Sequence, residues 1–263
     1  MFFLTVIGIF VAAITASASR DAHPPNTPLP CTATAPNELL EKHRDLAARH
    51  MIADRFSDNS INVDTFIHLF AANETYEGGW LNDTILAKQM EVLNEGFSQS
   101  NMRFTLKGTE RNITTSPTFG GPPAPLVEFF VKFRKGDYRS LNLYYMPNMY
   151  GGECSFPTMT GALNRQTSEF ILDGCRINSH TTPGGKAPFD AGKTTIHEVG
   201  HWFGLLHTFQ GGCNSTHGDF IDDTPAETKA KPEAEFGCPI GRNSCPHLPG
   251  FDPIHNYMDY TSE

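Results

Sequence analysis

The sequence predicts an α+β fold, in which a twisted mixed sheet with a backing helix and a site-bearing helix lies above a loop-rich lower subdomain. Two observations predict this class. Strand-like and helical patterns interleave up to about residue 175, and the rest of the chain is mostly loop around one strong helical segment. The chain has 263 residues, of which 39% are hydrophobic and 19% charged, enough for one globular domain with short appendages.

Residues 1–18 are expected to form a secretory signal peptide. The apolar run from Met1 to Ile14 is too short for a relaxed membrane span, and it precedes the small-x-small pattern Ala16-Ser17-Ala18. No Lys or Arg precedes the run, so an uncleaved anchor is the alternative. No later segment has the apolar length of a spanning helix, and we therefore expect a secreted, extracellular product without membrane attachment.

Residues 19–59 are expected to form a pro-segment or linker that contains a helix. Residues 19–35 are rich in proline and poor in apolar side chains, whereas residues 37–49 have the spacing of an amphipathic helix. Residues 60–263 then form the main domain.

Within the main domain, hydrophobic periodicity predicts the remaining elements in order. We expect an apolar strand at 61–72, interior to the sheet, a helix at 81–97, strands at 102–106 and 141–145, helical spacing over 126–133 and a short strand at 170–172. The strand at 141–145 is expected to lie at the sheet edge and to bind an extended peptide antiparallel to itself.

The strongest chemical signal is the run from His197 to His207. His197 and His201 are four residues apart, so on a helix both imidazoles face one ion roughly 2 Å away. Glu198 flanks that ion without needing to bind it, which is the place of a general base for a zinc-bound water. Continued helix would carry His207 about 15 Å along the axis, so the helix must break, and Gly204 stands where it can.

These residues predict a catalytic zinc centre with His197, His201 and His207 as ligands and an open fourth position. Thr195 and Glu198 also match a capping box, which would make Glu198 a helix-start residue without a catalytic role. That alternative does not explain Gly204 and His207 as well as the zinc centre does. Ile196, Val199, Trp202 and Phe203 are assigned to the core side of the helix.

The extended zinc signature resembles that of the metzincin clan of zinc metallopeptidases. Within the clan, the segments around Gly211-Gly212-Cys213, Asp222-Asp223-Thr224-Pro225 and Asn256-Tyr257-Met258-Asp259-Tyr260 resemble the pappalysin family, closest to the secreted extracellular metalloproteases of fungi. The resemblance covers roughly residues 140–263 well. It implies a zincin-like catalytic domain, a methionine turn with Met258 below the histidines, and a role for the Tyr260 hydroxyl at zinc or the oxyanion.

The resemblance also bears on the cysteines. It implies a disulfide between Cys213 and Cys238 and makes Cys31 a candidate latency thiol, although a plain disulfide role for Cys31 is the alternative. Proximity in the sequence suggests a bond between Cys154 and Cys175, but the sequence leaves their pairing open, like that of Cys31 and Cys245. Relatives continue past the methionine turn, so the chain is expected to be truncated at its C-terminus.

Oxygen-rich residues suggest two further kinds of site. Asp219, Asp222, Asp223 and Thr224 are candidate calcium ligands, as some relatives suggest, or a turn cluster that caps local amides. Four sequons are candidate glycosylation sites, at Asn73, Asn82, Asn112 and Asn214.

The formal charge of −9 and the lack of any basic run argue against a nucleic-acid partner. We expect a monomeric zinc endopeptidase that acts on extracellular proteins or peptides. The alternative is a secreted zinc-binding protein with little or no catalytic activity, because the segment after Tyr260 is missing.

Overall fold

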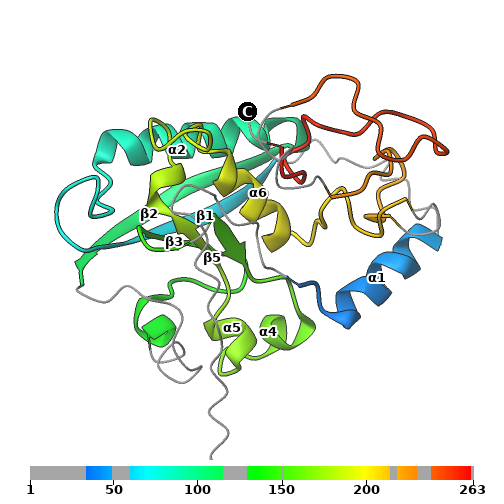
Figure 1. Ribbon diagram of the computed structural model, residues 1–263. Helices are drawn as coiled ribbons and strands as arrows, with labels where there is room; N and C mark the ends of the chain where they lie inside the picture. Colours follow the sequence, from blue (N-terminus) through cyan, green and yellow to red (C-terminus); the bar gives the residue numbers. More distant parts are fainter. Residues whose placement is uncertain are drawn as a thin grey trace, which may run out of the picture.

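In the part of the chain that the structure describes, five strands form one mixed sheet in the order β2-β1-β3-β5-β4 (Figure 1). This computed structural model describes residues 34–48, 60–114, 129–149, 151–213, 218–229 and 238–261. The strands are β1 (Ile61–Ala71), β2 (Met102–Ile113), β3 (Leu141–Met146), β4 (Gly152–Cys154) and β5 (Cys175–Asn178). Neighbouring strands run parallel, except that β4 pairs antiparallel with β5. The predicted mixed sheet is confirmed.

The described helices are α1 (Asn37–Ala48), α2 (Asp83–Gly96), α4 (Met159–Leu163), α5 (Ser168–Ile171) and α6 (Lys193–Trp202), with 3₁₀ turns η1 (Ser98–Ser100) and η2 (Ser179–Thr181). Residues 129–133 are also helical. The predictions for 37–49 and 81–97 are confirmed within two residues. None of the described helices is long and apolar enough to cross a membrane.

The core lies on both faces of the sheet. On one face, α2 and α6 pack against the strands, where Leu93 and Val199 join Ile67, Leu143 and Ile177 in a single buried cluster. On the other face a smaller cluster covers the sheet, formed by Phe70, Phe130, Tyr144 and Met146. Because β1 lies between β2 and β3, its near-continuous apolar run matches the interior position that the sequence predicts.

The prediction that residues 141–145 form an edge strand is wrong. This segment is β3, the middle strand of the sheet, and all six of its residues are buried. The sequence misleads because Asn142 looks like a solvent-facing residue. In the fold its side chain is buried, where Oδ1 contacts Nε2 of His68 at 3.0 Å and accepts a hydrogen bond from the amide of Lys135 at 2.9 Å. The short strand β4 forms the edge instead.

The strand predicted at 170–172 is also wrong. Residues Ser168–Ile171 form the helix α5, which Thr167 caps by accepting the Phe170 amide hydrogen bond. The next strand, β5, begins only at Cys175, and a disulfide joins Cys175 to Cys154 of β4, the pair that proximity in the sequence suggests. The covalent bond therefore links the edge strand to its neighbour.

Two contacts position α6, the helix that carries the zinc motif. The Tyr145 hydroxyl of β3 lies 3.0 Å from Thr195 Oγ1, and Gln89 of α2 donates to the Gly192 carbonyl at 3.0 Å. The helix begins at Lys193, with Gly192 as its N-cap and no side-chain cap. Thr195 is thus inside the helix, and the capping-box alternative for Glu198 is ruled out.

Candidate metal centre

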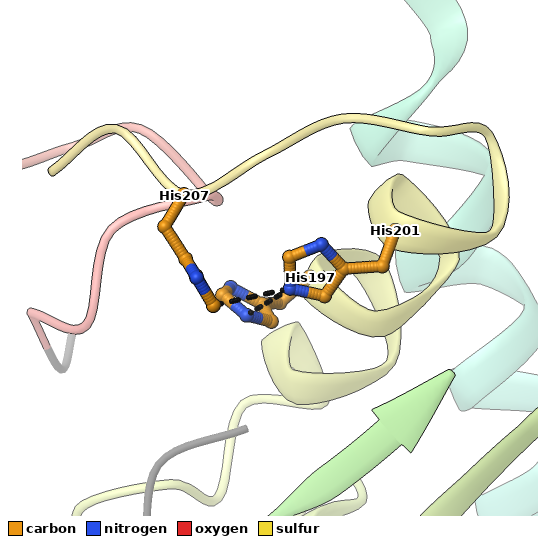
Figure 2. Close-up of side chains that lie close together, drawn as sticks. All are labelled: His197, His201 and His207. Carbon is orange, nitrogen blue, oxygen red and sulfur yellow. Dashed lines mark hydrogen bonds between the residues drawn. The ribbon is translucent and has the colours of Figure 1, made fainter. Parts of the chain in front are cut away.

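Three buried histidines converge at the C-terminal end of α6 (Figure 2). Nε2 of His201 lies 3.2 Å from Nε2 of His197 and 3.1 Å from Nε2 of His207. Among the described residues, they are the only group of three His, Cys, Asp or Glu side chains whose ligand atoms all lie within 4.8 Å of one another. The spacing of four residues brings the first two together, as expected for one helical turn.

The chain turns at Gly204, which brings His207 back toward the helix. Gly204 has φ +97°, a conformation that costs glycine little. Its amide donates to the His201 carbonyl at 2.8 Å, and the Leu205 amide donates to the Gly200 carbonyl at 2.9 Å. This pair of bonds is the Schellman motif, so the predicted helix break at Gly204 is confirmed.

Backbone carbonyls orient two of the imidazoles. Nδ1 of His197 lies 2.6 Å from the Tyr257 carbonyl oxygen, and Nδ1 of His201 lies 2.7 Å from that of Leu205. A carbonyl accepts only, so each Nδ1 carries the proton and each Nε2 presents its lone pair. This is the tautomer that binds a metal through Nε2, and a donor set of three neutral imidazoles fits zinc.

Burial keeps the three histidines neutral. It lowers the pKa of His197 to about 3 and that of His201 to about 4. The pKa of His207 is lowered first by burial and then by its neighbours His197, His201 and Lys229. All three are therefore ready to bind a metal at neutral pH without first losing a proton.

Glu198 lies against the edge strand. Its side chain is 1% exposed, and a Cβ built on Gly152 of β4 would fall 2.4 Å from its Cγ and 2.6 Å from its Oε1. Only a glycine leaves room for the carboxylate here. Sequence reasoning missed Gly152, because a glycine in a short loop-flanked strand carries no chemical signal of its own.

Met258 packs against Gly200 of α6, the helix that carries His197 and His201, and its role as a methionine turn stays a prediction. It is 6% exposed, and a Cβ built on Gly200 of α6 would fall 2.4 Å from its sulfur. The turn is tied to the third histidine's segment, since the Thr208 amide donates to the Met258 carbonyl at 3.2 Å.

Aromatic rings surround His207. The Phe209 ring stacks on His207 at 4.7 Å, and the Tyr260 ring meets the imidazole edge-on, also at 4.7 Å. Nζ of Lys229 lies 4.9 Å from the Tyr260 ring centroid and 5.9 Å from that of Phe209. Tyr260 therefore lies beside His207, and its role in catalysis stays a prediction, whereas Lys229 was not foreseen.

Comparison with known proteins agrees with this geometry. The family model described as "Peptidase_M43: Pregnancy-associated plasma protein-A" matches residues 150–263. An extracellular metalloprotease of Pyricularia oryzae is 41% identical over 272 residues, which cover 99% of this chain and 90% of the relative. This chain belongs to the pappalysin family of metalloproteases. A second extracellular metalloprotease, from Colletotrichum graminicola, is 43% identical over 205 residues, covering 77% of this pappalysin and 69% of the relative.

Solved structures share the fold of this pappalysin. Mature mirolysin of Tannerella forsythia, in complex with a cleaved peptide, aligns with TM-score 0.61 at 24% identity, covering 78% of this chain and 86% of that one. A promirolysin mutant of the same organism aligns with TM-score 0.65 at 22% identity, covering 86% and 81%. The predicted zincin-like α+β class is confirmed.

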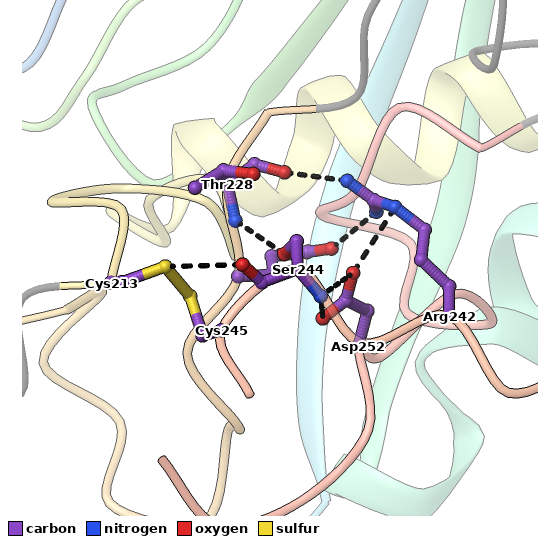
Figure 3. Close-up of a disulfide and its surroundings, with 7 residues drawn as sticks. Cys213, Thr228, Arg242, Ser244, Cys245 and Asp252 are labelled. Atoms are coloured by element: carbon purple, nitrogen blue, oxygen red, sulfur yellow. Dashed lines mark hydrogen bonds and ion pairs between the residues drawn. A yellow bond between two sulfur atoms is a disulfide. The ribbon is translucent and has the colours of Figure 1, made fainter. Parts of the chain in front are cut away.

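One predicted disulfide of the pappalysin is wrong. Cys213 is bonded to Cys245, not to Cys238 (Figure 3). Cys238 lies elsewhere, with its sulfur 3.4 Å from the Ile254 carbonyl oxygen. The pairing was carried over by analogy, and spacing alone cannot decide between two cysteines seven residues apart.

The other residues that the sequence singles out do not belong to the cluster of three histidines. Asp219 is buried and accepts the Ile221 amide hydrogen bond at 3.0 Å, which is the local turn role, while Asp222 and Asp223 are exposed. Calcium binding there, with Thr224, stays a prediction. Asn73 and Asn82 are exposed and Asn112 is partly buried. Residues 1–18, Cys31 and Asn214 lie outside the described residues.

Proposed function

We propose that this pappalysin is a secreted zinc endopeptidase that hydrolyses peptide bonds in extracellular proteins, with His197, His201 and His207 as the metal ligands. One observation carries the proposal. Three Nε2 atoms face one point, and the buried Glu198 carboxylate follows the first ligand on the same helix. The family membership and the extracellular metalloproteases among its relatives support the same interpretation.

Each side chain of the site has its own role in the proposed hydrolysis. When bound, zinc supplies a Lewis acid and lowers the pKa of a coordinated water toward about 7. Glu198 accepts a proton from the attacking water and passes it to the departing amine, which breaks the C–N bond. The Tyr260 hydroxyl donates to the oxyanion as negative charge develops on the former carbonyl oxygen. Met258 packs under the imidazoles and keeps them in place.

The edge strand β4 is the proposed substrate-binding strand. An extended peptide adds to an open sheet edge through main-chain hydrogen bonds, and in the described residues β4 pairs only with β5. Gly152 brings this edge directly against Glu198. A peptide lying along β4 therefore passes the general base and the three histidines. The mirolysin structure with a cleaved peptide supports binding of a peptide by this fold.

The test uses purified mature protein and casein. Wild type should degrade casein, and a chelator should abolish the activity until zinc is restored. Glu198→Gln should keep its zinc and lose at least about 100-fold in rate, because general-base contributions are typically 10²–10⁴-fold. Glu91→Gln, on an exposed position of α2, is the matched control and should remain active.

Two results would contradict the proposal. Wild type that carries zinc but cleaves nothing would favour the zinc-binding protein without catalysis. Full activity in Glu198→Gln would remove Glu198 from the mechanism.

A further inference from the structure

Lys229 places a cation beside the metal centre. Its side chain is exposed, and its Nζ lies over the Tyr260 and Phe209 rings at 4.9 and 5.9 Å. Both rings contact the His207 imidazole, so the ammonium is one aromatic ring away from a zinc ligand. Among the residues that the structure describes, Lys229 forms no ion pair with a carboxylate.

Hydrogen bonds hold the backbone of Thr228, the residue before Lys229, at both its amide and its carbonyl (Figure 3). The Thr228 amide donates to Ser244 Oγ at 2.8 Å, and the Thr228 carbonyl accepts from Arg242 Nη2 at 2.6 Å. The next residue after Ser244 is Cys245, whose disulfide to Cys213 staples this loop. The backbone that leads into Lys229 is therefore held in place by these contacts.

The neighbouring cation of this region, Arg242, is already paired. It contacts Glu227 Oε2 at 2.8 Å and Asp252 Oδ2 at 3.1 Å, and both carboxylates are buried. The Asp252 carboxylate also accepts the Ser244 amide at 2.9 Å. Arg242 is thus neutralised inside the loop, whereas the charge of Lys229 is left beside the metal centre. The cation–π contacts hold the ammonium over the rings without cancelling its charge.

We propose that Lys229 is a specificity-determining residue, which selects substrates carrying a carboxylate close to the scissile bond on the side of His207 and Tyr260. The inference rests on the proposed peptidase function. Although the chain has a net charge of −9, bound zinc and Lys229 would both offer positive charge on this side of the site, so an Asp or Glu side chain there gains a partner. The free C-terminal carboxylate of a short peptide offers the same chemistry.

Hydrolysis of peptides tests the proposal. A library of proteome-derived peptides, cleaved by wild type and read by mass spectrometry, should show enrichment of Asp and Glu at one position near the scissile bond. Capped peptides that differ only in Glu or Gln at that position should then differ about fivefold in kcat/KM, as expected for an ion pair with partial exposure. Comparing free-acid with amidated peptide ends separates a side-chain carboxylate from a terminal one.

Substitutions of Lys229 test whether this residue causes the preference for an acidic side chain. Lys229→Gln should bring the Glu-to-Gln ratio close to one, and Lys229→Glu should reverse it toward a Lys-containing peptide. Lys107→Gln on β2 removes the same charge far from the site and should leave the ratio as in wild type. Zinc content and melting temperature identify any variant that fails to fold. An unchanged ratio in Lys229→Gln, or no acidic preference in wild type, overturns the proposal.

Binding separates this inference from the proposed function. The same Glu and Gln peptides are titrated onto zinc-loaded Glu198→Gln protein, with and without Lys229→Gln. If wild type cleaves nothing but Glu peptides still bind about fivefold more tightly in a Lys229-dependent way, the peptidase function fails and the specificity role stands. If wild type cleaves peptides without any Lys229-dependent preference, the peptidase function stands and the specificity role fails.

Discussion

Replacing Gly152 by alanine should disable the proposed general base without emptying the metal site. The added Cβ would fall 2.4 Å from Glu198 Cγ and 2.7 Å from its Cδ, closer than a real Cβ comes to another heavy atom. The strand backbone is held by β5 and by the Cys154–Cys175 disulfide, whereas the Glu198 side chain can rotate about its own single bonds. The carboxylate therefore moves, by roughly 1 Å, and displacements of this size cost about 100-fold in rate.

Casein hydrolysis, zinc content and melting temperature together test this reasoning. We expect Gly152→Ala to lose about 100-fold in kcat/KM, to bind zinc like wild type and to melt within a few degrees of it. Gly108→Ala on β2 is the matched control, because its Cβ would meet nothing closer than Phe66 Cδ1 at 3.8 Å. Full activity in Gly152→Ala would refute the placement of Glu198 against the edge strand, and loss of zinc would show that the helix itself moved.

Four further predictions follow from the site and the surface. Gly200→Ala should lower the free energy of unfolding by about 1–3 kcal/mol, because the added Cβ clashes with the Met258 sulfur. In urea unfolding, Met258→Ala added to Gly200→Ala should recover part of that loss, whereas additive effects of the two substitutions would contradict the contact. Because burial lowers the pKa of His201 to about 4 and that of His197 to about 3, protons do not compete with zinc until the pH is acidic. Zinc affinity, measured by chelator competition, should thus stay nearly flat from about pH 7 to 5, and a steep decline through 6.5 would show that the imidazoles are not buried. The metal-free protein should lose stability as the pH falls from 6.5 toward about 4, because only the unfolded chain takes up protons there. In a glycosylating host, peptide mapping should find glycans on Asn73 and Asn82, which are exposed, but not on Asn112, whose Nδ2 is buried. Asn82 caps α2 through its Oδ1, which accepts from the Ile85 amide at 2.9 Å, so its Nδ2 is still available for a glycan.

The metal centre was predictable because its geometry is local. His197, His201 and Gly204 belong to one helix and its end, so a spacing of four residues and a glycine are enough to place them. Apolar runs were similarly informative for β1 and α2, where the burial pattern follows the sequence directly.

Long-range contacts were not predictable in this way. Whether Leu141–Met146 lies at the edge or in the middle of the sheet depends on which strands pair with it. Asn142 is polar but buried in contact with His68, so the residue pattern of this strand does not indicate a central position. The partner of Cys213 depends on the path of a loop, and the proximity of Gly152 to Glu198 depends on how a three-residue strand docks. None of these leaves a periodic trace in the sequence.

The hydrogen bonds from the histidine Nδ1 atoms to the carbonyls of Tyr257 and Leu205 have an evolutionary consequence. A side-chain acceptor would be lost by a single substitution, whereas a peptide carbonyl is present whatever residue occupies the position. Positions 205 and 257 are therefore free to vary in side chain as long as the chain keeps its path. The orientation of the imidazoles depends instead on the path of the backbone, above all at Gly204. The metal centre therefore tolerates side-chain substitutions around it better than substitutions that change a turn.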